Sequence, residues 1–537
     1  MSIEYVSRFT AVKTDRFPWH LAIWRNMKKF IGVLAAVLLL QVGVGEAMDT
    51  ITKPADVELK KILADFDQYA AHSLIDWKIP GMAIGIVQDG RLIFSKGFGV
   101  KTVGGNDPIT PNTIFQIGST TKAFTATLAA MLVDEGKFTW EDKVITHIPD
   151  FMMADPWVTR EFQIVDLMAQ HSGMPGYAAD SLYFFGFDQR YIRQAVRHIK
   201  PVTSFRTKYA YQNNLWHVSA EIIEKYSGQT WEQTLRHRIF EPLEMAQSSA
   251  DKQSFLNAAD VSSLHVMDKE NVVALPKNWK YLDWSYTAGP AGSINSNITD
   301  MAKWLTFQMN DGKINDKQVV SETNLQVVRS PKTAVALGSK VHNNIFYCMG
   351  WIYMEHSPYP IIWHNGGTTM KTMVAFVPEQ RVGIVILSNF ETQLPEILAF
   401  RFFDQYAGKS AKDLSAEGLA ELEKMKKEIN AKKPVRPPHP LPAMPLEKYT
   451  GNYANDVYGK VSISVIDDKL ILEIGPKNVK LALTHWDKDI FAVNWTDYCA
   501  DLEFGFAMFQ ADPQGKITGV TLDSLNQDDD LGIFKRR

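Results

Sequence analysis

Cysteine is almost absent from this chain: Cys348 and Cys499 are the two cysteines among 537 residues. They lie roughly 150 positions apart, a spacing that matches no metal-binding motif, so we expect no metal ion. Cysteine outside disulfides is often buried as a small apolar residue. We therefore expect two buried thiols, with a disulfide between them as the alternative.

Charge of one sign, long apolar runs and internal repeats are also missing. The chain has 57 lysine and arginine residues against 60 aspartate and glutamate residues, a formal net charge of −3. This balance lacks the clustered positive charge of a nucleic-acid-binding protein, so we expect no nucleic-acid partner. Beyond residue 47 no apolar run approaches the ~20 residues that span a membrane. The length predicts two or three domains.

The N-terminus carries a short apolar segment of a different kind. Met27, Lys28 and Lys29 form a positive region, residues 30–44 are apolar except for one glutamine, and small residues follow. This order is typical of a secretory signal peptide. We expect residues 1–47 to direct the protein to the periplasm or outside the cell, with Met27 as the true start. An uncleaved membrane anchor is the alternative.

A charged and then proline-rich stretch divides the chain. Residues 412–433 are rich in charge with apolar residues at helical spacing, and residues 434–442 contain five prolines. Prolines at this density stop a helix and form a stiff linker. We therefore expect a large domain over residues 55–408, a charged helix and linker over 409–442, and a small domain over 443–537.

The apolar pattern of the large domain changes along its length. Period-two alternation with tight turns marks both ends, which predicts hairpins. The middle follows helical periodicity. The large domain is therefore predicted to be of mixed α/β (α+β) class, with an antiparallel sheet flanked by helices and a helical subdomain. The supporting segments are 82–94 and 374–387 for strands, and 123–135, 215–226, 299–309 and 397–406 for helices.

The tail has a strand pattern only. Apolar residues alternate over 461–474 and again over 504–508, with short polar turns between them. Period-two alternation of this kind is typical of a small antiparallel sheet or barrel. We expect residues 443–537 to form a β-barrel-like domain.

Ser119 and Lys122 form an SxxK pair at the start of a predicted helix. Residues three apart on a helix share a face, so the lysine can reach the serine hydroxyl. It can accept the serine proton only if burial or nearby positive charge lowers its pKa. Free backbone N–H groups at the helix start would favour developing negative charge. A second SxxK at 249–252 has no helical pattern behind it, so Ser119 is the predicted nucleophile.

Two further motifs supply polar groups. In the first, Tyr211 can act as a general base beside a lysine, and Asn213 offers both a donor and an acceptor. The second places His364, Gly366 and Gly367 just before the second hairpin, as a glycine-rich strand that a substrate backbone could approach closely.

Together these motifs resemble one family. The order SxxK, then YxN about 90 residues on, then HxG about 150 residues later is similar to the class C β-lactamase and penicillin-binding-protein-like serine hydrolases. Their relatives include esterases and D-amino-acid peptidases. Residues 114–118, 167–175 and 288–293 also resemble stretches of the family. The resemblance covers about residues 60–408, and the tail resembles a lipocalin-like β module.

The resemblance implies a mechanism without a cofactor. Ser119 would form an acyl-enzyme, while Lys122 and Tyr211 share the proton transfers, and which of them is the base stays open. Backbone N–H groups of Ser119 and Gly367 would form the oxyanion hole. The substrate-binding residues would be Asn213, His364, Gly366 and Gly367.

One departure bears on the substrate. β-Lactamases and DD-peptidases of this kind usually carry a lysine where His364 stands, and no Lys-Thr-Gly or Lys-Ser-Gly occurs in the chain. Neutral histidine holds a carboxylate less firmly than a permanent ammonium. We therefore expect hydrolysis of small-molecule esters or of small (D-amino-acid) peptides and amides. The alternatives are a β-lactamase or D-alanyl-D-alanine carboxypeptidase, and a non-catalytic scaffold or sensor that binds peptidoglycan.

Overall fold

The computed structural model describes residues 53–338, 343–410, 412–493, 505–525 and 530–537. They divide into two compact units, with the boundary along the chain between Glu423 and Lys424. The predicted signal peptide and Cys499 lie outside the described residues, whereas Cys348 is buried. Within the described ranges, no helix has both the length and the apolar character needed to cross a membrane.

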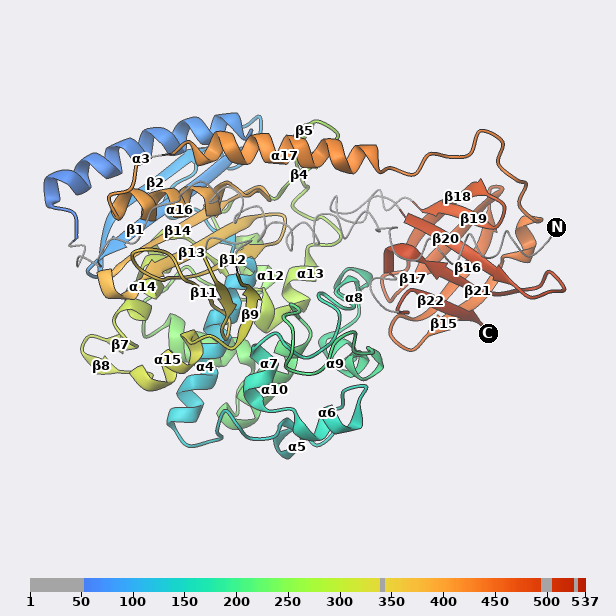
Figure 1. The fold of residues 1–537 in the computed structure, drawn as a ribbon, viewed down its shortest axis with the longest axis horizontal. Helices are drawn as coiled ribbons and strands as arrows, with labels where there is room; N and C mark the ends of the chain where they lie inside the picture. Colours follow the sequence, from blue (N-terminus) through green and yellow to red (C-terminus); the bar gives the residue numbers. More distant parts are fainter. Residues whose placement is uncertain (1–52, 339–342, 411, 494–504, 526–529) are drawn as a thin grey trace. The chain divides into compact units, whose positions relative to one another are not determined.

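The larger unit is built on an eight-stranded antiparallel sheet of order β2-β1-β14-β13-β12-β11-β10-β9 (Figure 1). The N-terminal hairpin pairs with the last strand of the sheet, Met82 lying opposite Ser388. This confirms the predicted antiparallel sheet with strands from both ends of the domain. The strands are β1 (Gly81–Gln88), β2 (Arg91–Gly99), β9 (Thr333–Ala336), β10 (Ile345–Tyr347), β11 (Ile352–Met354), β12 (Ile361–Gly367), β13 (Lys371–Val377) and β14 (Val382–Ser388).

Helices cover the sheet on both sides, as predicted (Figure 1). On one side Gly85 makes room for α14, since a Cβ there would lie 2.5 Å from the Ile298 side chain. On the other side Phe66 of α3 packs edge-on against Phe402 of α16. The charge-rich segment forms α17, whose start is held by a hydrogen bond from Trp77 Nε1. These helices are α3 (Asp56–Asp76), α14 (Ile298–Met309), α16 (Leu394–Tyr406) and α17 (Leu414–Ala431).

The middle of the chain forms the predicted helical subdomain. Local capping explains several boundaries: the Asp155 side chain accepts from the first backbone N–H groups of α6, and Gly228 ends α10 with a φ of +70°. Its helices are α4 (Thr121–Asp134), α5 (Val144–His147), α6 (Pro156–Glu161), α7 (Ile164–Met168), α8 (Ser181–Phe185), α9 (Gln189–Ala195), α10 (Leu215–Ser227), α11 (Trp231–Leu235), α12 (Lys252–Asn257), α13 (Asp283–Thr287) and α15 (Glu322–Arg329). Short two-stranded pieces pair β3 (Phe115–Gln116) with β6 (Asn295–Ser296), β4 (His265–Asp268) with β5 (Asn271–Ala274), and β7 (Lys313–Ile314) with β8 (Lys317–Gln318).

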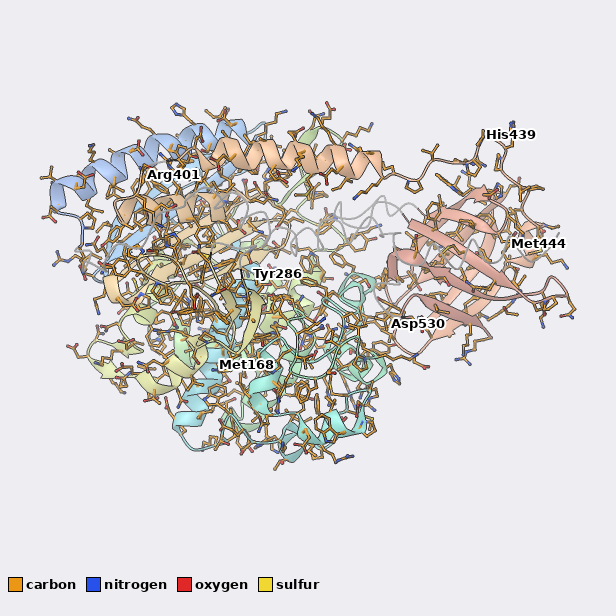
Figure 2. The ribbon with its side chains drawn as sticks, in the orientation of Figure 1. Met168, Tyr286, Arg401, His439, Met444 and Asp530 are labelled. Atoms are coloured by element: carbon orange, nitrogen blue, oxygen red, sulfur yellow. The ribbon has the colours of Figure 1, made fainter. Side chains whose placement is uncertain are left out.

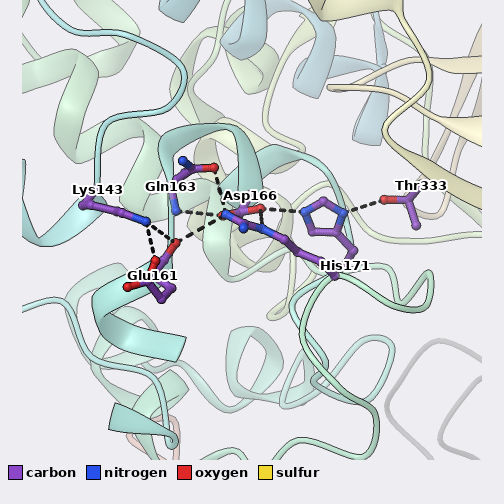
Figure 3. A network of polar contacts seen from close by, with 7 residues as sticks. Lys143, Glu161, Gln163, Asp166, His171 and Thr333 are labelled. Atoms are coloured by element: carbon purple, nitrogen blue, oxygen red, sulfur yellow. Dashed lines mark hydrogen bonds and ion pairs between the residues drawn. The ribbon is translucent and has the colours of Figure 1, made fainter. Parts of the chain in front are cut away.

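A polar network centred on the buried Asp166 joins this subdomain to the edge strand β9 (Figure 3). Asp166 accepts hydrogen bonds from His171 Nε2 at 2.8 Å and from Arg206 Nη2 at 2.6 Å. Thr333 Oγ1 lies 2.8 Å from His171 Nδ1. Burial acts to raise the pKa of Asp166, but these donors hold it below its ordinary value. Within the stretch 167–175, which resembles the family, His171 therefore has a structural role: it links Asp166 to Thr333.

The second unit contains a closed barrel of eight strands, each paired with the next and β15 with β22. This confirms the predicted barrel-like domain. Tyr453 is fully buried, and its hydroxyl donates to the Tyr449 carbonyl oxygen at 2.6 Å. In β20 the inward residues include Phe509, while Phe506 is half-buried. The strands are β15 (Gly451–Asn455), β16 (Gly459–Ile466), β17 (Lys469–Ile474), β18 (Val479–Asp487), β19 (Ile490–Val493), β20 (Gly505–Ala511), β21 (Ile517–Leu522) and β22 (Ile533–Arg536).

Candidate active site

Ser119 lies on a tight turn, η2 (Gly118–Thr120), that leads directly into α4. Gly118 has a φ of +51°, in the left-handed region that favours glycine. A Cβ on Gly118 would lie 2.9 Å from Gly367 N, and one on Gly366 would lie 2.0 Å from Ile117 O and 3.0 Å from Ser119 N. The glycines therefore allow the turn and the end of β12 to cross in direct contact.

Lys122 is fully buried on the first turn of α4. Its Nζ lies 3.1 Å from Ser119 Oγ, 2.7 Å from Asn213 Oδ1 and 2.8 Å from Ala291 O. Burial lowers the pKa of Lys122 well below its ordinary value, against the opposing charge of Asp180. A neutral amine has two N–H groups and one lone pair. Since the two carbonyl oxygens can only accept, they take the N–H groups and leave the lone pair for the serine hydroxyl.

Tyr211 packs against the lysine through its ring. Lys122 Nζ lies 4.7 Å from the ring centroid. The buried Tyr211 hydroxyl has no hydrogen-bond partner of ordinary geometry among the described residues, although Ser119 lies close enough to favour its ionised form. Burial is the larger effect and, with Tyr177 adding to it, raises the pKa of Tyr211 well above 10. The phenol is therefore protonated at neutral pH.

His364 is buried on β12 with both ring nitrogens engaged. Nδ1 lies 2.5 Å from the Asn365 carbonyl oxygen and is the donor, while Nε2 lies 3.2 Å from the Tyr347 hydroxyl and accepts from it. Burial, followed by the positive charge of Lys122, lowers the pKa of His364 to about 3. The ring is neutral and offers no charge to a substrate carboxylate.

Lys371 stands opposite Gly367 on the neighbouring strand β13. Its Nζ lies 3.0 Å from Glu391 Oε1 and 3.2 Å from Glu396 Oε1, with 7% of the side chain exposed. Burial acts to lower its pKa, but the two carboxylates raise the pKa of Lys371 above its ordinary value. Cross-strand partners share a face and successive residues alternate. The lysine therefore lies on the face opposite to His364.

Asp180 is a site residue that sequence reasoning missed. Asn213 Nδ2 donates to Asp180 Oδ2 at 2.6 Å, so the amide oxygen of Asn213 is turned toward Lys122. Burial raises the pKa of Asp180 to about 7, although Asn213 and Lys122 act in the other direction. Asp180 lies in an irregular segment just before α8, and no periodicity or motif marks it.

The side of the site that carries the Ala291 carbonyl is formed by α13 and the segment after it. Trp284 of α13 stacks on Phe184 of α8 with ring centroids 4.9 Å apart. Tyr286, labelled in Figure 2, accepts from Gln116 Nε2 at 3.1 Å and donates to Asn295 Oδ1 at 2.9 Å. Gln116 belongs to β3, which leads into the turn that carries Ser119. These contacts hold in place the segment whose Ala291 carbonyl accepts a hydrogen bond from Lys122.

The second SxxK does not form a comparable arrangement. Lys252 is ion-paired with Asp283, with 42% of its side chain exposed, and Ser249 Oγ accepts from Asn295 Nδ2 at 3.0 Å. The structure thus brings Ser119, Lys122, Tyr211, Asn213, His364, Gly366 and Gly367 together around one turn. Across the described ranges, no group of three or more His, Cys, Asp or Glu side chains is arranged to hold a metal ion.

An antiparallel sheet with helices on both faces, and a serine one turn before a buried lysine, define a serine hydrolase of the β-lactamase/transpeptidase fold. The chain belongs to the Beta-lactamase family, whose sequence model matches residues 66–400, more than half of its length. A second model, described as a domain of unknown function (DUF3471), matches residues 435–533.

Curated relatives and solved structures agree with this membership. The unguisins hydrolase ungD' of Aspergillus campestris (strain IBT 28561) is 27% identical over 444 residues, 76% of this chain and 79% of that protein. Protein flp of Staphylococcus aureus (strain COL) is 25% identical over 61% of this chain and 63% of its own. The octameric penicillin-binding protein homologue from Pyrococcus abyssi shares the fold, with a TM-score of 0.58 at 20% identity, over 88% of this chain and 100% of its own.

Proposed function

We propose that this chain is an exported serine hydrolase that cleaves esters or small peptides and amides, including those of D-amino acids, through an acyl-enzyme on Ser119. The observation that carries the proposal is Lys122: it is fully buried and has its Nζ 3.1 Å from Ser119 Oγ. Membership of the Beta-lactamase family and a relative named as a hydrolase support the reaction class. Export rests on the signal-peptide pattern of residues 1–47.

In the proposed mechanism Lys122 is the base. As Ser119 Oγ attacks the substrate carbonyl carbon, its proton passes to the lone pair of Lys122 Nζ. The negative charge on the substrate oxygen would be met by the backbone N–H groups of Ser119 and Gly367. Tyr211, protonated because its pKa is raised, gives its proton to the leaving group and recovers one from the Lys122 ammonium. Water then releases the acyl group by the same steps in reverse.

The charges around the site support an uncharged substrate near β12. His364 is neutral because burial lowers its pKa to about 3. Lys371 is bound to Glu391 and Glu396. Neither offers a free cation to the carboxylate that a penicillin or a D-alanyl-D-alanine peptide carries. Esters and small amides are therefore favoured over β-lactams, and cell-wall peptides are the alternative.

Intact-mass spectrometry after exposure to a fluorophosphonate, a p-nitrophenyl ester and a penicillin tests the proposal. Ser119→Ala should lose the fluorophosphonate adduct and the ester turnover together. Ser249→Ala is the matched control, because Ser249 begins the other SxxK and should keep both. Full ester turnover in Ser119→Ala would end the proposal. A persistent penicilloyl adduct on the wild-type protein would move the assignment to a penicillin-binding role.

A further inference from the structure

The loop that ends at Asp180 is held against the segment that carries Tyr211 and Asn213. Tyr177 N donates to Tyr211 O at 2.7 Å, and the two rings pack with centroids 5.0 Å apart. Tyr177 and Ala179 have φ values of +60° and +61°, a region that is costly for residues other than glycine. These contacts hold the loop in a strained conformation and so fix the position of Asp180 at its end.

The result is a fixed orientation of the Asn213 amide. An asparagine side chain can present either its oxygen or its NH₂ group to a neighbour. An ionised carboxylate only accepts, so Asp180 Oδ2 takes the NH₂ group at 2.6 Å and turns the oxygen to Lys122 Nζ at 2.7 Å. That oxygen occupies one lysine N–H, and the Ala291 carbonyl occupies the other. The lone pair that remains is the one directed at the serine.

We propose that Asp180 is the positioning residue of this site, which orients Asn213 and sets the charge balance of Lys122. The inference rests on the proposed function of Ser119 and goes beyond it, because it assigns a role to a residue that does not touch the reacting atoms.

Among the residues that the structure describes, four titratable side chains lie close enough to Asp180 to interact with its charge. Lys122 faces it from α4, Tyr177 from its own loop, Tyr183 from α8 and Tyr211 from the segment before α10. Burial raises the pKa of all three phenols well above 10, so they stay neutral. The Asp180 carboxylate favours the ammonium form of Lys122, whereas burial favours the free amine. Asp180 and Lys122 are thus a coupled pair.

Two substitutions separate orientation from charge. Asp180→Asn can still accept from the Asn213 NH₂ group but carries no charge, so the pKa of Lys122 falls. Because hydrolysis requires the free amine, the acidic limb of the kcat/KM profile should move to lower pH, by about one unit for a charge a few ångströms away. Asp180→Ala also removes the acceptor, so Asn213 can turn, and kcat should fall by about 100-fold with little change in KM.

Asp188→Asn is the matched control, because Asp188, like Asp180, directly precedes a short helix. Its side chain accepts from the backbone N–H of Tyr191, at 2.7 Å, a bond that asparagine can keep. It should keep the wild-type profile. The proposal is overturned if the acidic limb stays in place in Asp180→Asn, or if Asp180→Ala keeps the wild-type kcat. Melting temperatures confirm that each variant is folded.

An infrared titration tests the charge role without any turnover. Burial also raises the pKa of Asp523 to about 6, so the band is assigned from the difference between variants. The wild type and Ser119→Ala should both show a carboxylic-acid C=O band that disappears as the pH rises through neutrality and that is missing from Asp180→Asn, in which the Asp523 band remains. Absence of this band from the wild type would overturn the charge role. Because the titration needs no nucleophile, a failure of the Ser119 assignment and a failure of the Asp180 assignment give different results.

Discussion

Replacing Gly366 with alanine tests the crossing of the serine turn and β12. The new Cβ would lie 2.0 Å from the Ile117 carbonyl oxygen, 2.9 Å from its carbon and 3.0 Å from Ser119 N. All three are backbone atoms, so no flexible side chain can move aside. The turn and the strand must separate by more than about 1 Å to restore ordinary contact in a close-packed interior.

That separation acts on the proposed oxyanion hole. Donors in such a site stabilise the transition state only at about 2.7–3.1 Å from the developing oxyanion, and loss of one lowers kcat by about 10²–10³-fold. We therefore expect Gly366→Ala to lower kcat for a p-nitrophenyl ester by about 10²–10³-fold. Overpacking should also destabilise the fold by about 1–3 kcal/mol. The rates are therefore compared per folded molecule, measured by circular dichroism at the assay temperature.

Gly367→Ala is the matched control on the next residue of the strand. Its methyl group would point to the other face and meet the end of the exposed Glu391 side chain, at 3.0 Å from Oε2. That side chain can move, and the backbone N–H of residue 367 is kept, so we expect less than about a tenfold loss. If folded Gly366→Ala retained the activity of Gly367→Ala, the crossing would have no part in catalysis.

Two further predictions concern buried charge. Lys371→Met removes the cation from the buried Glu396 carboxylate and should lower the free energy of unfolding by about 3–5 kcal/mol; a loss below about 1 kcal/mol in urea unfolding would contradict this. Hydrogen bonds hold the pKa of Asp166 below its ordinary value in the folded protein. The ionised carboxylate therefore stabilises the fold fully at a pH above its unfolded-state pKa, and this stability is lost as the pH falls through its folded-state pKa. Acid unfolding of the wild type should therefore show a loss below about pH 4 that is absent from Asp166→Asn, and parallel curves would refute this.

The elements of the fold that the sequence predicts well are those with a local period. The helix expected over 215–226 is α10 (Leu215–Ser227), and the hairpin expected over 374–387 is β13 and β14. In both cases the buried face and its turn or cap lie within one short stretch of chain. The SxxK pair was predictable for the same reason, because a spacing of three positions on a helical turn places Lys122 beside Ser119.

The parts of the site that were missed depend on contacts between distant segments. Asp180 reaches Asn213 through a loop with two non-glycine residues at positive φ, and no sequence pattern specifies that conformation. The proposal of Lys122 rather than Tyr211 as the base could not be made from the sequence either, because it depends on burial. Burial lowers the lysine pKa and raises the tyrosine pKa. Both effects appear only when α4, α10 and β12 are assembled.

The missing Lys-Thr-Gly motif is not replaced by a lysine from the next strand. Lys371 lies directly across from Gly367, close in sequence to where an anion-binding lysine would be useful. Its position in the register, however, places it on the face of Gly367 rather than that of His364, and successive strand residues alternate between faces. Moving the cation to the active-site face would require a one-residue slip, which would exchange the two faces of β13. Because every residue of β13 is buried, the slip would disrupt the packing on both faces. The register therefore keeps the His364 face without a free cation.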